Sequence, residues 1–225
     1  MKSKTVVLVH GIWMTGYEMS WLGQQLKNSG YEVHYFRYSS LFVEPRESAQ
    51  RLQTFIKGLN VEQVDLIGHS LGGIILLHLF SLSPVLPPGR IVLLGSPVLG
   101  SGVARRLSIN PVMRLLLGNT TERGLLGDAP SWRGDRDLGV IAGERGIGVG
   151  SVIGGLSGSH DGTVAVAETR LPGATDFCTL RVGHFDMLFS RAVARQTMQF
   201  LRQGRFDGGS GAIPAPPPVS DTPAE

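Results

Sequence analysis

Ser70 lies between glycines in the stretch Gly-His-Ser-Leu-Gly at positions 68–72. An apolar run of strand type at 63–69 precedes it, and an apolar run of helical type at 71–81 follows. The serine could cap this helix, or the turn could hold its hydroxyl as a nucleophile. The pattern G-x-S-x-G between a strand and a helix favours the nucleophile. Glycines relieve crowding on so tight a turn, and the start of a helix offers N–H groups to a developing negative charge.

A hydroxyl nucleophile needs a base, and His184 is the best placed of the six histidines. It follows the last expected strand at 175–182 and precedes the last expected helix at 189–203, with Gly183 allowing the loop to bend. The alternative is a capping or core histidine. The remaining histidines fit the role less well, because they lie within a strand or helix, face away from the serine or bond to backbone: His10, His34, His69, His78 and His160.

Asp161 is the candidate partner of that base. It lies in the glycine-rich loop Ser-Gly-Ser-His-Asp-Gly after the expected strand at 137–144, where its carboxylate could accept the Nδ1–H of a histidine. The alternative is an ordinary Asp-Gly turn. Asp186 is a rival partner, but it is only two residues from His184 and would have to fold back sharply. The order Ser70, Asp161, His184 is the one expected for this motif.

The loop after the first strand predicts an oxyanion hole, a pair of N–H groups that binds negative charge. Its sequence is Val-His-Gly-Ile-Trp at 9–13. Gly11 lets the chain turn, and Ile12 is the expected donor, with Trp13 second. The N–H of Leu71, directly after the serine, supplies the other half.

The elements that position these residues alternate between strands and helices. Strands are expected at 5–10, 31–38, 63–69, 90–96, 137–144 and 175–182, and helices at 17–30, 45–60, 71–81 and 189–203. The pattern predicts an α/β fold with a mostly parallel sheet of about six strands and helices on both faces. Such sheets place their chemistry at the carboxyl ends of the strands. We expect one catalytic domain over 1–205, a short insertion at 96–136 near the site, and a disordered Gly/Pro-rich tail over 206–225.

Composition excludes several other classes of protein. A hydrophobic content of 42% and a charged content of 17% over 225 residues describe one globular domain. The net charge of +3 is spread along the chain, so no nucleic-acid partner is expected. A single cysteine, Cys178, cannot form an internal disulfide and is expected to be buried filler. The apolar run at 74–86 is too short to span a bilayer, so we expect a cytoplasmic protein without stable membrane insertion. The oligomeric state is left open.

Together these blocks resemble the α/β-hydrolase superfamily, specifically its small bacterial lipases and esterases. The segments "VLVHGIW", "LIGHSLGG", "SHDGTVAVAE" and "VGHFDMLF" resemble its oxyanion, nucleophile, acid and histidine blocks, in order. The resemblance implies that Ser70 is the nucleophile, Asp161 the acid and His184 the base, with Ile12 and Leu71 as oxyanion donors. The sheet here is minimal, and the insertion is short for a cap domain. Some relatives bind calcium near the histidine loop, but no set of oxygen ligands converges here, so neither a metal nor another cofactor is expected.

These observations predict a serine carboxylic ester hydrolase for a small-molecule acyl ester. The apolar residues Trp13, Met14, Phe42 and Met113 are candidates for a pocket that accepts short to medium acyl chains. The same three catalytic residues would serve an acyltransferase or a thioesterase, and the sequence does not separate these. A relative of this fold that binds a ligand without turnover is a third alternative, although binding alone would not require all three residues.

Overall fold

The molecule is built on one parallel sheet. The computed structural model describes residues 4–82, 84–120, 124–146 and 154–214. Within these ranges six strands lie in the order β2-β1-β3-β4-β5-β6, and every neighbouring pair is parallel. Their bounds are β1 Lys4–Val9, β2 Tyr31–Phe36, β3 Val64–His69, β4 Ile91–Leu94, β5 Leu138–Gly143 and β6 Asp176–Leu180. The predicted fold class is confirmed.

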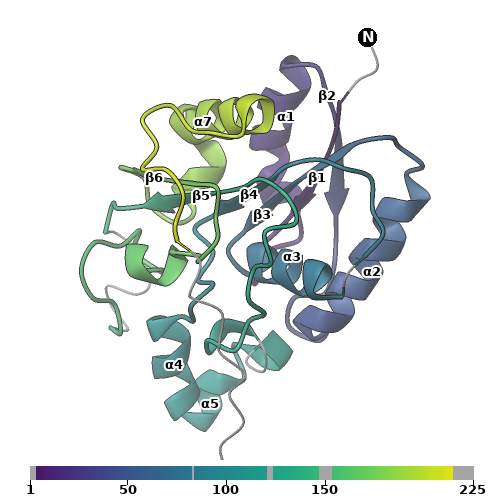
Figure 1. Cartoon of the computed structure of the whole chain (residues 1–225). Coiled ribbons are helices and arrows are strands. Elements are labelled where there is room, and N and C mark those ends of the chain that lie inside the picture. Colours follow the sequence, from purple (N-terminus) through teal and green to yellow (C-terminus); the bar gives the residue numbers. More distant parts are fainter. Residues whose placement is uncertain (1–3, 83, 121–123, 147–153, 215–225) are drawn as a thin grey trace, which may run out of the picture.

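Helices cover both faces of the sheet (Figure 1). On one face lie α1 (Ser20–Asn28) and α7 (Arg191–Gln203), and on the other lie α2 (Pro45–Gly58) and α3 (Leu71–Ser81). Side chains of a strand alternate between faces, so Val7 and Val9 of β1 join the α2–α3 side while Val6 and Leu8 join the α1–α7 side. Because both faces are covered, the strands read as continuous apolar runs.

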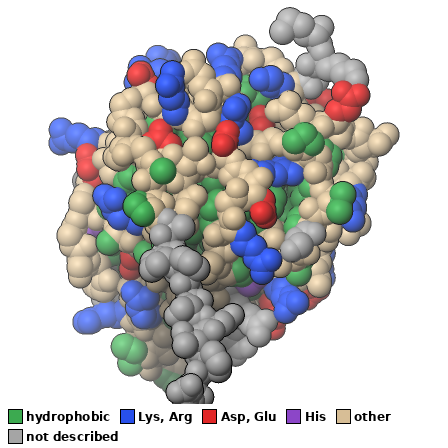
Figure 2. Space-filling model, viewed as in Figure 1, with side chains coloured by type: hydrophobic (Ala, Val, Ile, Leu, Met, Phe, Trp, Pro, Cys, Tyr) green, Lys and Arg blue, Asp and Glu red, His purple; other side chains and the backbone are tan. Residues whose placement is uncertain are grey.

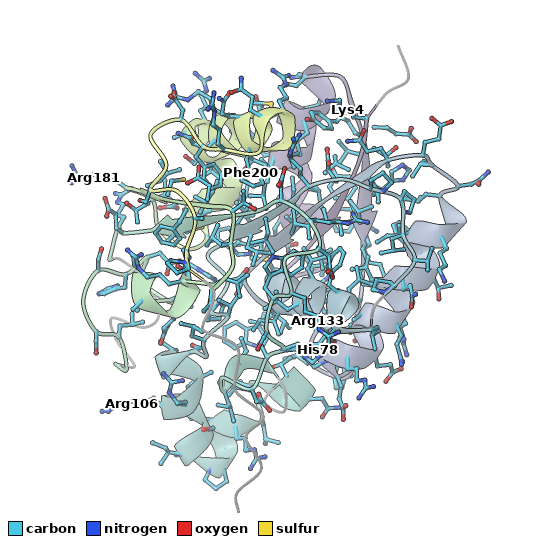
Figure 3. All side chains as sticks on the ribbon, in the orientation of Figure 1. Lys4, His78, Arg106, Arg133, Arg181 and Phe200 are labelled. Carbon is cyan, nitrogen blue, oxygen red and sulfur yellow. The ribbon has the colours of Figure 1, made fainter. Side chains whose placement is uncertain are left out.

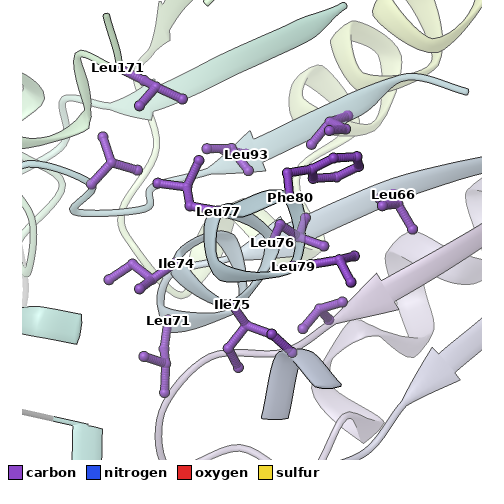
Figure 4. Close-up of a cluster of buried hydrophobic side chains, with 14 of the residues drawn as sticks. Leu66, Leu71, Ile74, Ile75, Leu76, Leu77, Leu79, Phe80, Leu93 and Leu171 are labelled. Atoms are coloured by element: carbon purple, nitrogen blue, oxygen red, sulfur yellow. The ribbon is translucent and has the colours of Figure 1, made fainter. Parts of the chain in front are cut away.

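Helix α3 is buried nearly all round, which is why its sequence lacks a polar face. Its residues from Leu71 to Phe80 are all buried, and Figure 4 shows their side chains packed among strand residues such as Leu66 and Leu93. The other three large helices are amphipathic, with residues such as Leu52 of α2 facing the sheet. A helix buried in this way holds the turn at its N-terminus rigidly, and that turn carries Ser70.

The final helix begins later than the sequence suggested. The expected element at 189–203 divides into a 3-10 turn η5 (Asp186–Phe189) and α7, with Ser190 between them in an extended conformation. The Ser190 hydroxyl accepts a hydrogen bond from the Val193 N–H at 3.4 Å, and Gly204 ends the helix with φ of 73°. The serine therefore starts a new helix directly after the loop that carries His184.

The insertion at 96–136 packs partly into the core and partly lies at the surface. It contains α4 (Gly102–Ile109), α5 (Pro111–Arg114) and the 3-10 turn η2 (Gly118–Thr120). Val103 and Leu107 of α4 join the α2–α3 side of the core, whereas α5 buries none of its residues. In Figure 1 these two helices lie away from α1 and α7, beyond the lower face of the sheet.

The expectation of a disordered tail from residue 206 is wrong for residues 206–214. Phe206 is 4% exposed, and its ring lies 4.9 Å from that of Phe200, a buried residue of α7 that is labelled in Figure 3. The Asp176 carboxylate accepts hydrogen bonds from the N–H groups of Phe206 at 2.7 Å and Gly211 at 2.8 Å. Composition did not indicate this order, because the segment is rich in glycine and proline and is held by the ring of Phe206 and the carboxylate of Asp176. Residues 215–225 lie outside the described part of the chain.

The surface carries charges of both signs. On the face in Figure 2, Lys and Arg side chains are interspersed with Asp and Glu rather than gathered in one block. Over the described residues, no helix combines the length and apolarity needed to cross a bilayer. Cys178 is buried, as expected for a filler, and burial together with nearby Asp176 raises the pKa of its thiol to about 12.

Candidate active site

Ser70 occupies a strained turn between β3 and α3. Its φ of 54° and ψ of −120° lie outside the regions that a serine ordinarily adopts. Its N–H donates to the carbonyl of Leu94 in β4 at 2.9 Å, which fixes the turn to the neighbouring strand. The side chain makes no capping hydrogen bond to α3. The helix-cap explanation therefore fails, because the Ser70 hydroxyl does not cap the helix although its backbone is strained.

The glycines around Ser70 are required by contact. A Cβ on Gly68 would lie 2.6 Å from the backbone N of Gly73, and one on Gly72 would lie 2.7 Å from the carbonyl oxygen of His10. Neither contact involves a flexible side chain that could move aside. The elbow thus packs directly on the end of β1, which brings the loop after β1 beside the serine.

His184 and Asp161 are brought together by the loops after β6 and β5. The His184 Nδ1–H donates to Asp161 Oδ2 at 2.7 Å, and the His184 N–H donates to the Asp161 carbonyl at 2.9 Å. The Asp161 side chain is 1% exposed, and its Oδ1 accepts from the N–H groups of Thr163 at 2.9 Å and Val164 at 2.7 Å. Because the carboxylate oxygen can only accept from Nδ1, the other ring nitrogen, Nε2, is free to accept a proton.

Asp186 lies in a different environment from Asp161. Its carboxylate is 3.8 Å from the guanidinium of Arg145, and both side chains are largely exposed. Within the described ranges it makes no hydrogen bond to the imidazole of His184. The geometry therefore separates the two candidate carboxylates clearly, with Asp161 at the ring and Asp186 at the rim.

The N–H groups of residues 11–13 differ in whether they have acceptors. The Gly11 N–H donates to the Met14 sulfur at 3.4 Å, and the Trp13 N–H donates to the Ser40 hydroxyl at 3.2 Å. Ile12 is the remaining residue of the loop, and in the part of the chain that the structure describes its N–H has no acceptor. An N–H left open beside the serine is what an oxyanion hole requires.

Leu71 and His10 complete this region. Leu71 is the first residue of α3, so its N–H has no partner within the helix. His10 is fully buried, its Nδ1–H donates to the Gly11 carbonyl at 2.9 Å, and its ring stacks on Tyr38 with centroids 4.3 Å apart. Burial lowers the pKa of His10, so the ring is a neutral support for the loop.

Ser70, His184 and Ile12 line one cavity of about 360 Å³. Much of its wall is apolar: Ile12, Trp13, Met14, Val103 and Phe185. Polar groups at its edge include Glu18, Thr163 and Asp186. Within the described part of the chain no hydrogen bond joins the Ser70 hydroxyl to His184, and catalytic contacts of this kind often tighten only when substrate is bound.

Of the four residues predicted to bind substrate, two line this cavity and two do not. Trp13 and Met14 line it, whereas Phe42, 78% exposed, lines a neighbouring hollow together with them. Met113 lies on α5, which buries no residue, and it lines neither hollow among the described residues. The Trp13 indole N–H donates to the Leu116 carbonyl at 2.7 Å. A role of Phe42 and Met113 in binding substrate stays a prediction.

Sequence reasoning missed four lining residues, Glu18, Val103, Thr163 and Phe185, and two of them lie close in the chain to predicted ones. Phe185 directly follows His184, and Thr163 is two residues beyond Asp161, so proximity in the chain was an available signal. Val103 had no such signal, because only the packing of α4 brings it to the cavity. In the described ranges no group of three or more His, Cys, Asp or Glu side chains could hold a metal ion. The absence of a metal cofactor stays a prediction.

Comparison with known proteins identifies the family to which the chain belongs. The sequence model of the alpha/beta hydrolase family matches residues 6–205. The chain belongs to the alpha/beta hydrolase family. A comparison with curated protein sequences finds no significant match.

Solved structures show how widely this hydrolase fold is used. The mature lipase BlEst2 of Bacillus licheniformis is similar with a TM-score of 0.74 and 19% identity, over 88% of this chain and 92% of that one. A bromoperoxidase from Bacillus anthracis has a TM-score of 0.61 at 12% identity, over 90% and 93% of the two chains. The esterase EaEST from Exiguobacterium antarcticum also has a TM-score of 0.61 at 12% identity, over 90% and 94%. At these identities the likeness shows the fold alone, and the function has to be argued from the site.

Proposed function

We propose that this chain is a serine carboxylic ester hydrolase. The observation that carries the proposal is one cavity containing both a serine on a strained elbow and a histidine whose Nδ1–H is held by a buried carboxylate at 2.7 Å. Strained backbone is retained where it has a function, and the Ser70 side chain has no capping role. The lipase and esterase among the structural neighbours are consistent with this reaction.

In the proposed reaction Ser70 Oγ attacks the carbonyl carbon of the ester as its proton passes to His184 Nε2. Asp161 stabilises the imidazolium that forms, and the N–H groups of Ile12 and Leu71 receive the negative charge on the carbonyl oxygen. His184 then gives the proton to the alcohol as the bond from carbon to alkoxy oxygen breaks, which leaves an acyl-serine. Water attacks this ester with the same base, releasing the acid and restoring the hydroxyl.

The cavity wall supports short to medium acyl chains as substrates. Apolar side chains such as Val103 and Phe185 would bury the chain, and each CH₂ removed from water contributes about 0.8 kcal/mol. Further exposed apolar side chains lie near the mouth, including Trp13 at 50% exposure and Leu116, which accepts the indole hydrogen bond. The preference should therefore rise with chain length until the cavity of about 360 Å³ is filled.

The test is a panel of p-nitrophenyl esters of rising acyl length, beside matched thioester and amide substrates. The proposal expects ester turnover in the wild type, loss of it in Ser70→Ala, and labelling of the wild type but not the variant by a serine-directed phosphonate. Competition of added alcohols or thiols with water would reveal an acyltransferase through its products. Thioester turnover well above ester turnover would favour a thioesterase, and failure of the phosphonate to label Ser70 would contradict all three.

A further inference from the structure

His69 lies between two loops of the site: the loop after β6 that carries His184, here called the histidine loop, and the loop at 10–13 after β1, here called the oxyanion loop. It is the last residue of β3 and is fully buried. Its position next to Ser70 led us to expect a side chain turned away from the chemistry, yet it lines the same cavity. Its Nε2 is 3.1 Å from the carbonyl oxygen of His184, and the two rings lie 4.8 Å apart at an interplanar angle of 42°.

The partners of His69 fix its tautomer. A carbonyl oxygen can only accept a hydrogen bond, so Nε2 of His69 carries the ring proton, and this N–H donates a hydrogen bond to the backbone carbonyl of His184. Burial, followed by the nearby charge of His184, lowers the pKa of His69 to about 3, so the ring is neutral and Nδ1 is unprotonated near pH 7. The other titratable groups near the ring are Asp161 and His10.

The Nδ1 end of the ring faces the oxyanion loop. Among the described residues this buried nitrogen has no hydrogen-bond partner. A Cβ on Gly11 would lie 3.1 Å from it and 3.1 Å from Cβ of Ser70, so Gly11 packs directly against both. One ring therefore spans from the histidine loop at its Nε2 end to the oxyanion loop at its Nδ1 end. An unpartnered buried acceptor costs stability, which calls for a reason to retain it.

We propose that His69 is a positioning residue that holds His184 and the oxyanion loop at their working separation from Ser70. The inference rests on the ester hydrolysis proposed above. The ring holds the His184 backbone through the Nε2–H and its imidazole through ring contact. Because it stays neutral, it does not repel the imidazolium that His184 becomes in each half-reaction. A protonated neighbour at this distance would oppose that step.

The experiment compares His69→Gln with His69→Met. The two side chains are similar in size, but only Gln offers an N–H to the His184 carbonyl. Loss of this hydrogen bond leaves the His184 carbonyl without its partner and should displace the loop. We therefore expect kcat to be about tenfold lower in His69→Met than in His69→Gln, with KM changed less than threefold. His34→Gln is the matched control, because His34 lies in β2 and pairs with Glu32 at 3.0 Å away from the cavity. It should leave both parameters unchanged.

A second readout does not depend on turnover. The Nδ1–H proton of His184, bonded to Asp161, should be visible by proton NMR in the wild type and in His69→Gln, and should broaden or vanish in His69→Met. Equal kcat values and equal NMR signals in the two variants would overturn the positioning role. If Ser70→Ala kept full turnover instead, the proposed function would fail, while the NMR comparison would still decide the inference about His69.

A third variant covers the case in which position 69 tolerates neither side chain. Gly11→Ala presses a methyl group against the His69 ring and Ser70 from the oxyanion side. We expect a folded protein with a lower kcat and little change in KM. An unchanged kcat in Gly11→Ala would overturn the inference, since the ring could then move without consequence.

Discussion

Replacing Asp161 with asparagine tests the link between the buried carboxylate and the base. In the wild type, Oδ2 accepts from His184 Nδ1–H while Oδ1 accepts from the N–H groups of Thr163 and Val164. Both carboxylate oxygens are thus acceptors that face donors. An asparagine amide has only one acceptor oxygen, so either orientation sets its NH₂ group against a donor.

The two orientations have different consequences for His184. If the amide oxygen stays with the backbone N–H groups, the NH₂ faces Nδ1, and the imidazole changes tautomer so that Nε2 carries the proton and cannot receive one from Ser70. If the amide flips, its NH₂ meets the N–H groups of Thr163 and Val164 in a site that is 1% exposed. We expect the first orientation, because it requires only a change of tautomer in the His184 ring, whereas the second leaves the N–H groups of Thr163 and Val164 without acceptors. The loss in kcat is then about 10⁴-fold, or about 5.5 kcal/mol of transition-state stabilisation.

The assay is steady-state hydrolysis of a p-nitrophenyl ester, with Asp186→Asn as the matched control. Asp186 lines the same cavity but is exposed and faces Arg145, so its variant should retain kcat within about threefold. Urea unfolding of both variants checks that each is folded. A ranking in which Asp186→Asn is the more damaged would refute the assignment of Asp161.

Four further outcomes are expected. Ser70→Ala should reduce turnover by about 10⁶-fold, and substantial activity in this variant would refute its role as nucleophile. Truncation after Gly204 removes the buried Phe206 and should cost about 3 kcal/mol and roughly 6–12 °C of melting temperature by calorimetry, whereas an unchanged melting temperature would show that the segment is not anchored. Cys178 should resist alkylation in the native protein and react only after unfolding, as mass spectrometry would show. His69 has a pKa of about 3 when folded and 6.5 when unfolded, so the unfolded chain binds the extra proton as the pH falls below 6.5. As the pH falls, the free energy of unfolding should therefore decline by up to about 1.4 kcal/mol per pH unit more in the wild type than in His69→Gln. Urea unfolding of both proteins at pH 7, 6 and 5 measures this difference, and an equal decline in the two proteins would contradict it.

Local pattern was sufficient to locate the strands and the larger helices. Parallel strands covered on both faces must be apolar along their length, so runs such as 63–69 were recognisable without the tertiary structure. The largest error in the elements was the segment after Gly204. Its order depends on Phe206 reaching Phe200 and on Asp176 receiving its N–H groups, and these contacts join residues far apart in sequence.

The candidate site divides in the same way. Ser70, Asp161 and His184 were predicted because each follows a strand, and the carboxyl ends of parallel strands share one edge of the sheet. Phe42 and Met113 do not line the cavity that contains Ser70, because hydrophobicity alone does not indicate which hollow an exposed side chain faces. His69 was expected to face away from Ser70, because neighbouring residues of a strand point in opposite directions. That alternation does not show what surrounds the side chain, and His69 lines the same cavity.

The sequence by itself determined the sheet, the elbow and the order of the three chemical residues, since these follow from periodicity, from glycine spacing and from the connectivity of alternating strands and helices. The tertiary structure decided which carboxylate reaches His184, which N–H of the first loop stays open, and that a neutral ring at position 69 joins the two loops. Those outcomes depend on distances of about 3 Å between groups up to 115 residues apart, and no local pattern encodes such distances.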